Sequence, residues 1–448
     1  MGADSINNYI PRTGQKRIVV IGGGFAGINL IQHLDHHNFQ IVLIDKHNHH
    51  TFQPLLYQVA TAGLGPGAIA SPLRNVFGKQ KNFHFRIAEV SKIDTANHTV
   101  ITQNDGSIEY DYLVLATGSK ANFFGNKEME AKAFKLKQVT DALAIRERFI
   151  TNFEEAILNR EANLDELMNV VVTGGGPTGV EISGAIAELR NKILPKDYPE
   201  LDFSKMRIII VEGQDRLLPT MTPFSSKRAE KYLQDLGVEI RLNVLLEDYT
   251  NDTVKLKNGE EIKTKLLIWS AGVQGTAVDG FEENLIHKGT YEVTDYNQIK
   301  GYSNVFAIGD TAHLTAENYP KGYPMVAQVA IQQGKQLAKN LIALQDGKEM
   351  KPFSYFDKGY MATMGRNKAV VETPIGVKFG GFIGWVAWLF VHLISIIGVQ
   401  NKLVTLGYWA YNYLTFNKGN RLLIQSSTPK PVVDETPTKR ETELQPSH

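Results

Sequence analysis

The stretch Arg17-Ile-Val-Val-Ile-Gly-Gly-Gly-Phe-Ala-Gly27 decides the fold, because it joins an apolar, β-branched run to a glycine-rich turn. Further along the chain, Asn169-Val-Val-Val-Thr-Gly-Gly-Gly-Pro-Thr-Gly179 has the same arrangement. In each copy a helical stretch follows, and then a second buried strand that ends in an acid, Asp45 in the first copy and Glu212 in the second. A repeated supersecondary unit of this length predicts one module that is used twice.

The chemistry of each copy is that of a dinucleotide site. Glycines permit a tight strand-to-helix turn and let a pyrophosphate approach the backbone, while the helix N-terminus supplies partial positive charge. The acid after the second strand accepts a hydrogen bond from a ribose hydroxyl. One glycine-rich turn is weak evidence, but both copies lie between a strand and a helix and both have the acid. The sequence therefore predicts an α/β protein with two Rossmann-like domains and two bound dinucleotides.

Composition excludes several other classes of function. A chain of 448 residues suggests two or three domains. A net charge of +1, with no polybasic run, excludes nucleic acid as a partner. The chain has no cysteine, which excludes disulfides, thiolate metal sites and dithiol redox chemistry. His47, His49 and His50 lack the spacing of a metal site, so we interpret them as a loop and predict no metal.

A third motif indicates which dinucleotide each of the two sites binds. Asn304-Val-Phe-Ala-Ile-Gly-Asp310 is a predicted strand that ends in Gly-Asp after the second copy. Taken alone it is only a turn signal, but with the two modules it resembles the two-dinucleotide flavoproteins that include glutathione reductase. In that family the Gly-Asp pair returns to the first domain and holds the ribityl and pyrophosphate region of the flavin. The resemblance implies that the first copy binds FAD, the second binds NAD, and the NAD domain is inserted in the FAD domain.

Two further stretches narrow the resemblance. Thr51-Phe-Gln-Pro-Leu-Leu-Tyr-Gln-Val-Ala60 and Ala327-Gln-Val-Ala-Ile-Gln-Gln-Gly334 look like the flavin loop and the Ala-Gln-x-Ala-x-Gln-x-Gly segment of type II NADH:quinone dehydrogenases. The resemblance runs from about Arg17 to about Leu423. It implies a single-subunit, non-pumping flavoenzyme of the respiratory chain. Such an enzyme takes hydride from NADH to FAD and passes two electrons to a membrane quinone, either ubiquinone or menaquinone.

The resemblance assigns site residues by position. The expected FAD contacts are Gly22, Gly24, Phe25, Ala26, Gly27, Asp45, Lys46, Gln53, Val90, Ala116, Thr117, Gly118, Gly309, Asp310, Ala327 and Gln328. The expected NAD contacts are Gly174, Gly176, Thr178, Gly179, Glu181, Glu212, Ala271 and Gly272. The expected catalytic residues are Glu181, Gln328 and Gln332.

The chemistry of the side chains supports some of these assigned roles more strongly than others. Gln328 and Gln332 share a helix face and can orient a quinone carbonyl, or they can be two satisfied amides on a packing helix. An acid such as Glu181 in a first helical turn is often stabilised by the helix dipole alone, and only the family makes it a proton-handling or conformational residue. A carboxylate at Glu212 accepts from a 2′-hydroxyl and repels a 2′-phosphate, which favours NADH. Arg216, four residues on, leaves NADPH possible.

The C-terminal part predicts a membrane surface. Residues 379–401 contain no Asp, Glu, Lys or Arg, and Trp385, Trp388 and Trp409 lie in or just after them. The early glycines, His392 and Ser395 shorten the apolar part, so we expect helices that lie in the interface and not a spanning helix. A dimer interface also uses aromatic residues, and the family suggests a homodimer as well. We predict a peripheral protein on the cytoplasmic side of the cell inner membrane.

The predicted boundaries are an N-terminal extension (1–16), an FAD domain (17–120 and 285–350), an NAD domain (121–284), a membrane-binding region (351–424) and a disordered tail (425–448). Two rival functions remain open. One is a soluble flavin reductase with a protein acceptor, and the other is an NADH-sensing flavoprotein like apoptosis-inducing factor.

Overall fold

A computed structural model of the chain describes residues 10–34, 38–103, 106–159 and 161–423. The predicted tail, 425–448, lies outside these residues, and so does the predicted N-terminal extension up to residue 9.

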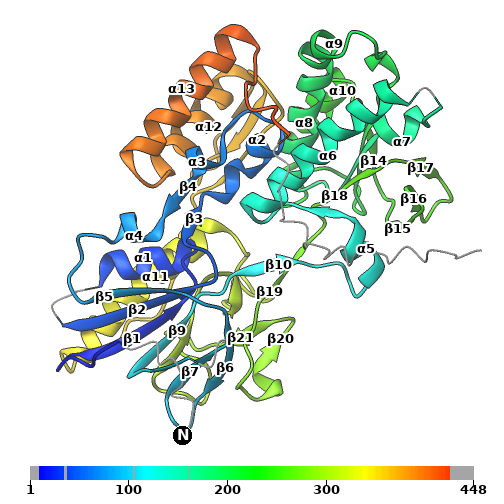
Figure 1. Cartoon of the computed structure of the whole chain (residues 1–448). Coiled ribbons are helices and arrows are strands. Elements are labelled where there is room, and N and C mark those ends of the chain that lie inside the picture. Colours follow the sequence, from blue (N-terminus) through cyan, green and yellow to red (C-terminus); the bar gives the residue numbers. More distant parts are fainter. Residues whose placement is uncertain (1–9, 35–37, 104–105, 160, 424–448) are drawn as a thin grey trace, which may run out of the picture.

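Two five-stranded parallel sheets form the frame of the molecule (Figure 1). The first has the order β22-β9-β1-β2-β5 and consists of β1 (Lys16–Ile21), β2 (Phe39–Asp45), β5 (Phe83–Ile87), β9 (Tyr112–Leu115) and β22 (Val305–Ala307). The second has the order β11-β18-β12-β13-β14 and consists of β11 (Phe134–Lys135), β12 (Val170–Thr173), β13 (Ile208–Val211), β14 (Glu239–Arg241) and β18 (Leu266–Trp269). The predicted α/β class and the repeated module are confirmed.

The two modules are interleaved along the chain. The outer strand β22 of the first sheet follows the whole second module, whereas the outer strand β11 of the second sheet precedes its own β12. Each module also carries an antiparallel three-stranded sheet, formed by β6 (Val90–Asp94), β7 (Thr99–Thr102) and β8 (Ser107–Glu109) or by β15 (Leu246–Thr250), β16 (Thr253–Leu256) and β17 (Glu261–Lys263). The two connecting segments pair with each other as β10 (Ser119–Ala121) and β19 (Val273–Gly275).

Helices cover the sheets, and one contact is set by a glycine. α1 (Phe25–His33) packs against α11 (Ala327–Gln345) on the first sheet. A Cβ atom on Gly334 would lie 2.4 Å from the carbonyl oxygen of Ala26, so only glycine permits this approach. The second sheet packs against α6 (Val139–Leu158) and α8 (Pro177–Lys192).

The other elements before the C-terminal part are mostly short, α10 being the exception. They are β3 (His49–Thr51), η1 (Gln53–Leu55), α2 (Leu56–Ala60), α3 (Pro66–Ile69), β4 (Ala70–Pro72), α4 (Leu73–Val76), α5 (Lys127–Lys132), α7 (Leu164–Met168), α9 (Leu194–Asp197), η2 (Phe203–Lys205), α10 (Pro223–Asp235), η3 (Glu283–Leu285), β20 (Ile286–His287), β21 (Thr290–Glu292), η4 (Gly309–Thr311) and β23 (Ala312–His313). The predicted loop at His49 and His50 is wrong, because both residues lie in β3. This strand pairs with β4, a partner distant in sequence that local composition does not reveal.

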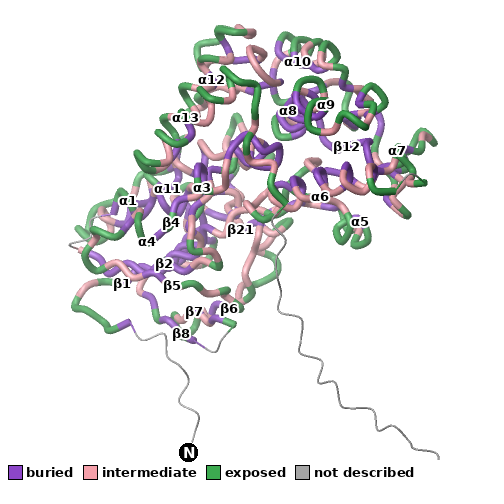
Figure 2. Tube along the Cα trace, turned by 45° about the horizontal axis from the view of Figure 1, so that its top comes forward, coloured by how far each residue is buried: buried purple, intermediate pink, exposed green. Residues whose placement is uncertain are grey.

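The C-terminal part adds an antiparallel sheet and two helices. β24 (Tyr360–Thr363), β25 (Ala369–Glu372) and β26 (Lys378–Gly380) lead into α12 (Gly381–Ser395) and α13 (Val399–Thr415). α12 packs against β25, and α13 packs against α3. The two helices are otherwise largely exposed (Figure 2). In the part of the chain that the structure describes, no helix has both the length and the apolar character needed to cross a membrane.

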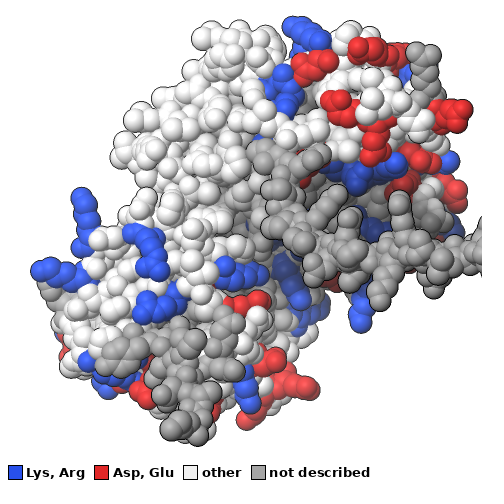
Figure 3. Space-filling view, viewed as in Figure 1, with Lys and Arg blue, Asp and Glu red and all other residues white. Residues whose placement is uncertain are grey.

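The exposed face of α12 and α13 is apolar. Its exposed large side chains are Phe382, Ile383, Val386, Phe390, Val391, Ile394, Val399, Leu403, Val404, Leu406, Tyr411, Tyr413 and Leu414. In the view of Figure 3 the surface over these helices is white, while charged side chains gather over the two modules. Such a contiguous exposed patch marks an interaction surface.

We expect Gly334→Ala to destabilise the protein, although alanine favours a helix. The added methyl group would collide with the backbone of α1, and overpacking of this kind costs about 1–3 kcal/mol. Gly407→Ala is the matched control, since a Cβ there meets no atom within 4 Å and helix propensity should then stabilise α13. Thermal unfolding of both variants with FAD present tests this, and equal behaviour of the two would contradict the packing argument.

Candidate active site

The two glycine turns have the same hydrogen-bond pattern. In the first module Asp45 accepts from the backbone N–H groups of Gly23 (2.6 Å) and His47 (2.7 Å). In the second module Glu212 accepts from the N–H groups of Gly175 (2.6 Å) and Gln214 (2.8 Å). Each acid is thus fixed against its turn by two bonds, and its remaining lone pairs are available to a ribose hydroxyl.

The glycines of each turn fall into two kinds. A Cβ on Gly27 or Gly179 would lie 2.0 Å or 1.9 Å from the carbonyl oxygen of Gly22 or Gly174, so these glycines are required for folding. A Cβ on Gly24 or Gly176 would meet no atom within 4 Å. The latter two are the N-caps of α1 and α8 and make no side-chain cap, so each helix N-terminus faces open space. That space suits the pyrophosphate of a dinucleotide, and the residues present fit FAD and NAD.

Other predicted FAD contacts gather around the first sheet. Ala26 and Ala116 are buried, the Thr117 hydroxyl donates to the Thr276 carbonyl, and Gly118 (φ +71°) and Gly309 (φ +73°) have left-handed backbone. The Phe25 ring contacts His50 and Phe52 edge-on at 5.0 Å and 5.8 Å between centroids. Gln53 and Lys46 are exposed, Val90 begins β6, and Ala327 begins α11.

Of the predicted NAD contacts, Thr178 is exposed on α8, while Ala271 and Gly272 follow β18.

Gln333 is a residue that the sequence analysis missed. Its buried side-chain oxygen accepts the backbone N–H of Gly309 at 2.7 Å and so fixes the Gly-Asp turn. It is the neighbour of Gln332, and only the three-dimensional position of Gly309 tells the two glutamines apart.

Glu181 is buried among residues from three elements, with 7% of its surface exposed. Burial raises its pKa to about 8, against smaller opposing effects of the Thr363 N–H and the Trp388 indole. Thr363, from β24, donates its N–H to the Glu181 carboxyl at 3.4 Å. Tyr57, from α2, has a pKa raised well above its usual range by burial and by the nearness of Glu181. Glu181 therefore holds a proton at neutral pH, which suits a group that takes part in proton transfer.

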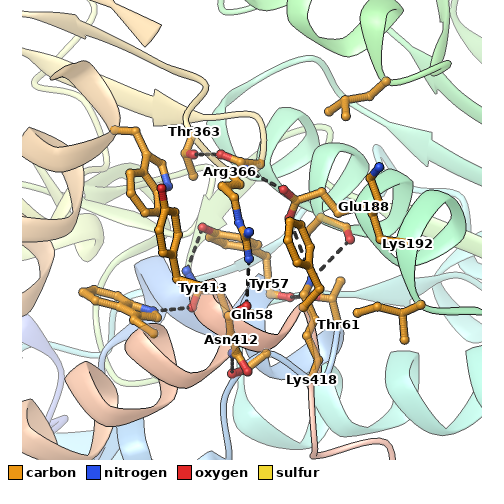
Figure 4. Close-up of a pocket in the computed structure, with 18 of the residues that line it drawn as sticks. Tyr57, Gln58, Thr61, Glu188, Lys192, Thr363, Arg366, Asn412, Tyr413 and Lys418 are labelled. Carbon is orange, nitrogen blue, oxygen red and sulfur yellow. Dashed lines mark hydrogen bonds and ion pairs between the residues drawn. The ribbon is translucent and has the colours of Figure 1, made fainter. Parts of the chain in front are cut away.

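Tyr57 and Thr363, which surround Glu181, also line a cavity of about 300 Å³ (Figure 4). Its walls come from α2, α8, the turn after β24, and α12 and α13, and they include Trp385, Trp388 and Trp409. Thr363 and Trp388 belong both to the cavity wall and to the surroundings of Glu181. The polar end of the cavity contains Glu188, with Lys418 at 4.0 Å.

His392 and Arg366 complete the surroundings of the cavity. The His392 ring stacks on Trp388 at 3.9 Å between centroids, and burial lowers its pKa to about 4. The Arg366 guanidinium lies over the Phe416 ring at 3.6 Å. The cavity thus combines aromatic walls with a few charged groups, the composition of a site for a small amphiphile.

Gln328 and Gln332 bind the segment that precedes β24. The Gln328 amide donates to the Gly359 carbonyl (3.2 Å) and accepts the Lys358 N–H (3.0 Å). Gln332 makes the same pair of bonds with the carbonyl and N–H of Phe356, at 2.8 Å and 3.0 Å. Neither residue lines the cavity. Each amide nitrogen keeps one N–H beyond these bonds.

The histidine run has local partners. His50 is buried with its Nδ1 3.0 Å from the Gly23 carbonyl, and burial lowers its pKa to about 4. The Nδ1 atom of His49 lies 2.9 Å from the Asn48 side-chain oxygen. Among the described residues, no three His, Cys, Asp or Glu side chains are placed to share a metal ion.

Comparison with known proteins identifies a matching family and several relatives. A family model described as pyridine nucleotide-disulphide oxidoreductase matches residues 16–334. The chain is 37% identical over 422 residues to the type II NADH:quinone oxidoreductase Ndh of Mycobacterium tuberculosis, covering 90% of this chain and 89% of that one. It is 30% identical over 383 residues to the type II NADH:quinone oxidoreductase of Haemophilus influenzae, covering 78% and 85%.

A solved structure has the same fold. The structure of NDH2 from Plasmodium falciparum in complex with NADH matches with a TM-score of 0.82, covering 92% of this chain and 100% of that one. The sequence identity is 20%, so this match concerns the fold.

Glu181→Gln should reduce the pH dependence of stability. The Glu181 pKa is about 8 in the folded protein against an ordinary value of 4.5, so between these values the folded state binds more protons than the unfolded state. The free energy of unfolding therefore falls as pH rises from about 4.5 to about 8. Glutamine removes this loss, and the variant should gain a few kcal/mol relative to the wild type between pH 4.5 and pH 8. Urea unfolding across this range measures the gain. The exposed Glu200→Gln is the control, and a difference from wild type that stays constant with pH would refute the burial argument.

Proposed function

The chain belongs to the pyridine nucleotide-disulphide oxidoreductases and, among them, to the type II NADH:quinone oxidoreductases, and we propose that it oxidises NADH through FAD and reduces a quinone at a membrane surface. The observation that carries the proposal is the pair of glycine turns with the same hydrogen-bond pattern, in which each acid is fixed by two backbone N–H groups. When bound, FAD supplies the hydride acceptor and the route for two electrons. We assign FAD to the first module and NADH to the second.

The residues of the chain bind and orient the two dinucleotides. Asp45 and Glu212 accept from the ribose hydroxyls, and the N-termini of α1 and α8 face the pyrophosphates. Glu212 carries negative charge to the place where NADPH would put its 2′-phosphate, which favours NADH. Gly309 and Asp310 lie in η4, just after β22, and would hold the ribityl chain of FAD.

We place the quinone ring in the cavity beside Glu181. α12 and α13 form part of the cavity wall, which supports our proposal that a quinone enters the cavity from the bilayer. Reduction of a quinone to a quinol consumes two protons, and the buried, protonated carboxyl of Glu181 lies behind the cavity wall. The spare N–H groups of Gln328 and Gln332 remain our prediction for a contact with a quinone carbonyl.

The exposed apolar face of α12 and α13 supports attachment to one leaflet. Apolar side chains of this kind insert at the headgroup boundary, and aromatic rings favour the same depth. An enzyme attached in this way reduces its quinone from one side of the membrane, so we propose that it does not pump protons. The cytoplasmic face of the inner membrane and a homodimer also belong to the proposal.

The function and the attachment are tested together with vesicles. Ile383→Ser, Leu403→Ser and Leu414→Ser combined should reduce vesicle binding at least tenfold, because three exposed apolar contacts are lost (71%, 64% and 80% exposed). NADH-dependent reduction of a water-soluble dye should stay at the wild-type rate, and reduction of a long-tailed quinone in the vesicles should fall. The control combines Phe224→Ser, Leu158→Ser and Leu245→Ser in the second module. High salt should release little wild-type protein, because apolar burial is not screened.

Three results would overturn this proposal. Unchanged vesicle binding of the first variant would refute the assigned surface. NADH oxidation that no quinone accelerates would favour a protein acceptor, and a long-lived reduced flavin with bound NAD would favour a sensor like apoptosis-inducing factor.

Cofactor choice has its own test. NADH should exceed NADPH in kcat/KM by well over tenfold, and Glu212→Ala should narrow that ratio because the repulsion of the 2′-phosphate is lost. The variant should also raise KM for NADH, since Glu212 holds the Gly175 N–H. Asp215→Ala, an exposed neighbour, controls for general charge. Equal use of NADH and NADPH by the wild type would disprove the role of Glu212.

A further inference from the structure

Lys137 is a residue outside every motif whose backbone is held by both modules. It lies between β11 (Phe134–Lys135) and α6 (Val139–Leu158), at the entry to the second module. Its N–H donates to the Asp141 carboxylate that caps α6, at 2.9 Å. Its carbonyl oxygen accepts from the side chain of Gln53, in the expected flavin loop of the first module, at 3.1 Å. The direction of the Lys137 side chain is therefore fixed by contacts on both sides.

The side chain points back into the first module. The Lys137 ammonium donates to the Ser119 hydroxyl at 3.0 Å, and that hydroxyl donates to Asp310 Oδ2 at 2.6 Å. Lys137 thus reaches, through one serine, the acid expected to hold the ribityl chain. Burial lowers the pKa of Lys137, while the negative charges of Asp310 and Asp141 raise it.

The ammonium group of Lys137 has hydrogen-bond donors that Ser119 does not use. It carries three N–H donors, and Ser119 takes one of them. Within the described residues the other two have no acceptor. A half-buried ammonium group with unused donors is costly unless another group satisfies it. Asp310 and Gln53 are expected FAD contacts, so the cofactor of the first module is a group that could satisfy these donors.

We propose that the Lys137 ammonium contacts FAD on the ribityl side of the flavin, next to Asp310, and supplies the positive charge that stabilises the flavin in its reduced, anionic form. The inference rests on the proposed function only in requiring that the first module binds FAD. A fixed opposite charge in a partly desolvated site acts strongly on a charge that develops beside it. Lys137 enters from the second module, so the module that binds NADH also contributes to the electrostatics of the flavin.

The alternative is a purely structural role, in which Lys137 joins the two modules through Ser119 and has no effect on the reduction of the flavin. The two readings differ in their measurable effects. Loss of a structural contact would change unfolding and FAD retention, whereas loss of a charge that faces the flavin would change the equilibrium between oxidised and reduced flavin.

The experiment uses the full-length holoenzyme with Lys137→Met, Lys137→Arg and Lys135→Met. Lys135 is exposed on β11, two residues away, and serves as the matched control. Two readouts need no quinone. One is the midpoint potential of the flavin against reference dyes, and the other is the dissociation constant of sulfite, which adds to the flavin ring and leaves a negative charge on it.

We expect Lys137→Met to weaken sulfite binding at least tenfold and to lower the midpoint potential, by about 30 mV for each tenfold change in the two-electron equilibrium. Lys137→Arg and Lys135→Met should resemble the wild type. If Lys137→Met does not fold with FAD, Lys137→Gln replaces it, because glutamine keeps an N–H donor and lacks the charge.

Wild-type sulfite affinity and potential in Lys137→Met or Lys137→Gln would overturn the proposal, even if thermal stability fell. Lys137→Arg behaving like Lys137→Met would overturn it too, since charge is then not the cause. A holoenzyme that fails to reduce quinone but shows the expected shifts would refute the proposed function and leave this inference standing.

Discussion

The rest of the structure depends on the distance between two glycines in each strand-to-helix turn. Gly27 and Gly179 lie so close to the carbonyl groups of Gly22 and Gly174 that a Cβ atom would overlap them. This contact lets the chain reverse within a few residues and leaves the first N–H groups of α1 and α8 pointing into open space. The acid after the next strand then bonds to the turn from the other side. One steric constraint thus sets the position of the helix dipole, the open space for a pyrophosphate and the carboxylate for a ribose.

Interleaving of the modules brings distant parts of the chain to the first turn. Because β22 pairs with β9, the Gly309-Asp310 turn follows a strand that lies beside β9, which ends at Leu115. Because β11 (Phe134–Lys135) belongs to the second sheet, Lys137, two residues beyond its end, starts from the second module and reaches Ser119 near the first. A Rossmann-like unit alone binds a dinucleotide, and in this chain Lys137 adds a charged group from the second module near Asp310 of the first.

How much the sequence predicts follows from the range of the interactions. The glycine turns, their acids and the order of strands and helices depend on neighbours in sequence, so pattern and spacing reveal them. The pairing of β3 with β4, the bond from Gly309 to Gln333 and the path from Lys137 to Asp310 join residues far apart. No local pattern distinguishes Gln333 from Gln332 or Lys137 from Lys135. The side-chain hydrogen bonds of Gln328 and Gln332 cannot be predicted from the sequence either, because their partners lie in a segment without regular secondary structure.

Burial links α12, one of the two helices with an exposed apolar face, to the carboxyl of Glu181. Trp388 comes from α12, is 1% exposed and forms part of the wall around Glu181, while Phe382, Ile383 and Phe390 on the same helix face outward. The high pKa of Glu181 arises first from burial, and α12 supplies part of that burial. A displacement of α12 that exposed Glu181 would therefore lower the affinity of the carboxyl for its proton. The cavity is lined by residues of the same helix and of α8, so α12 contributes both to the cavity wall and to the burial of Glu181.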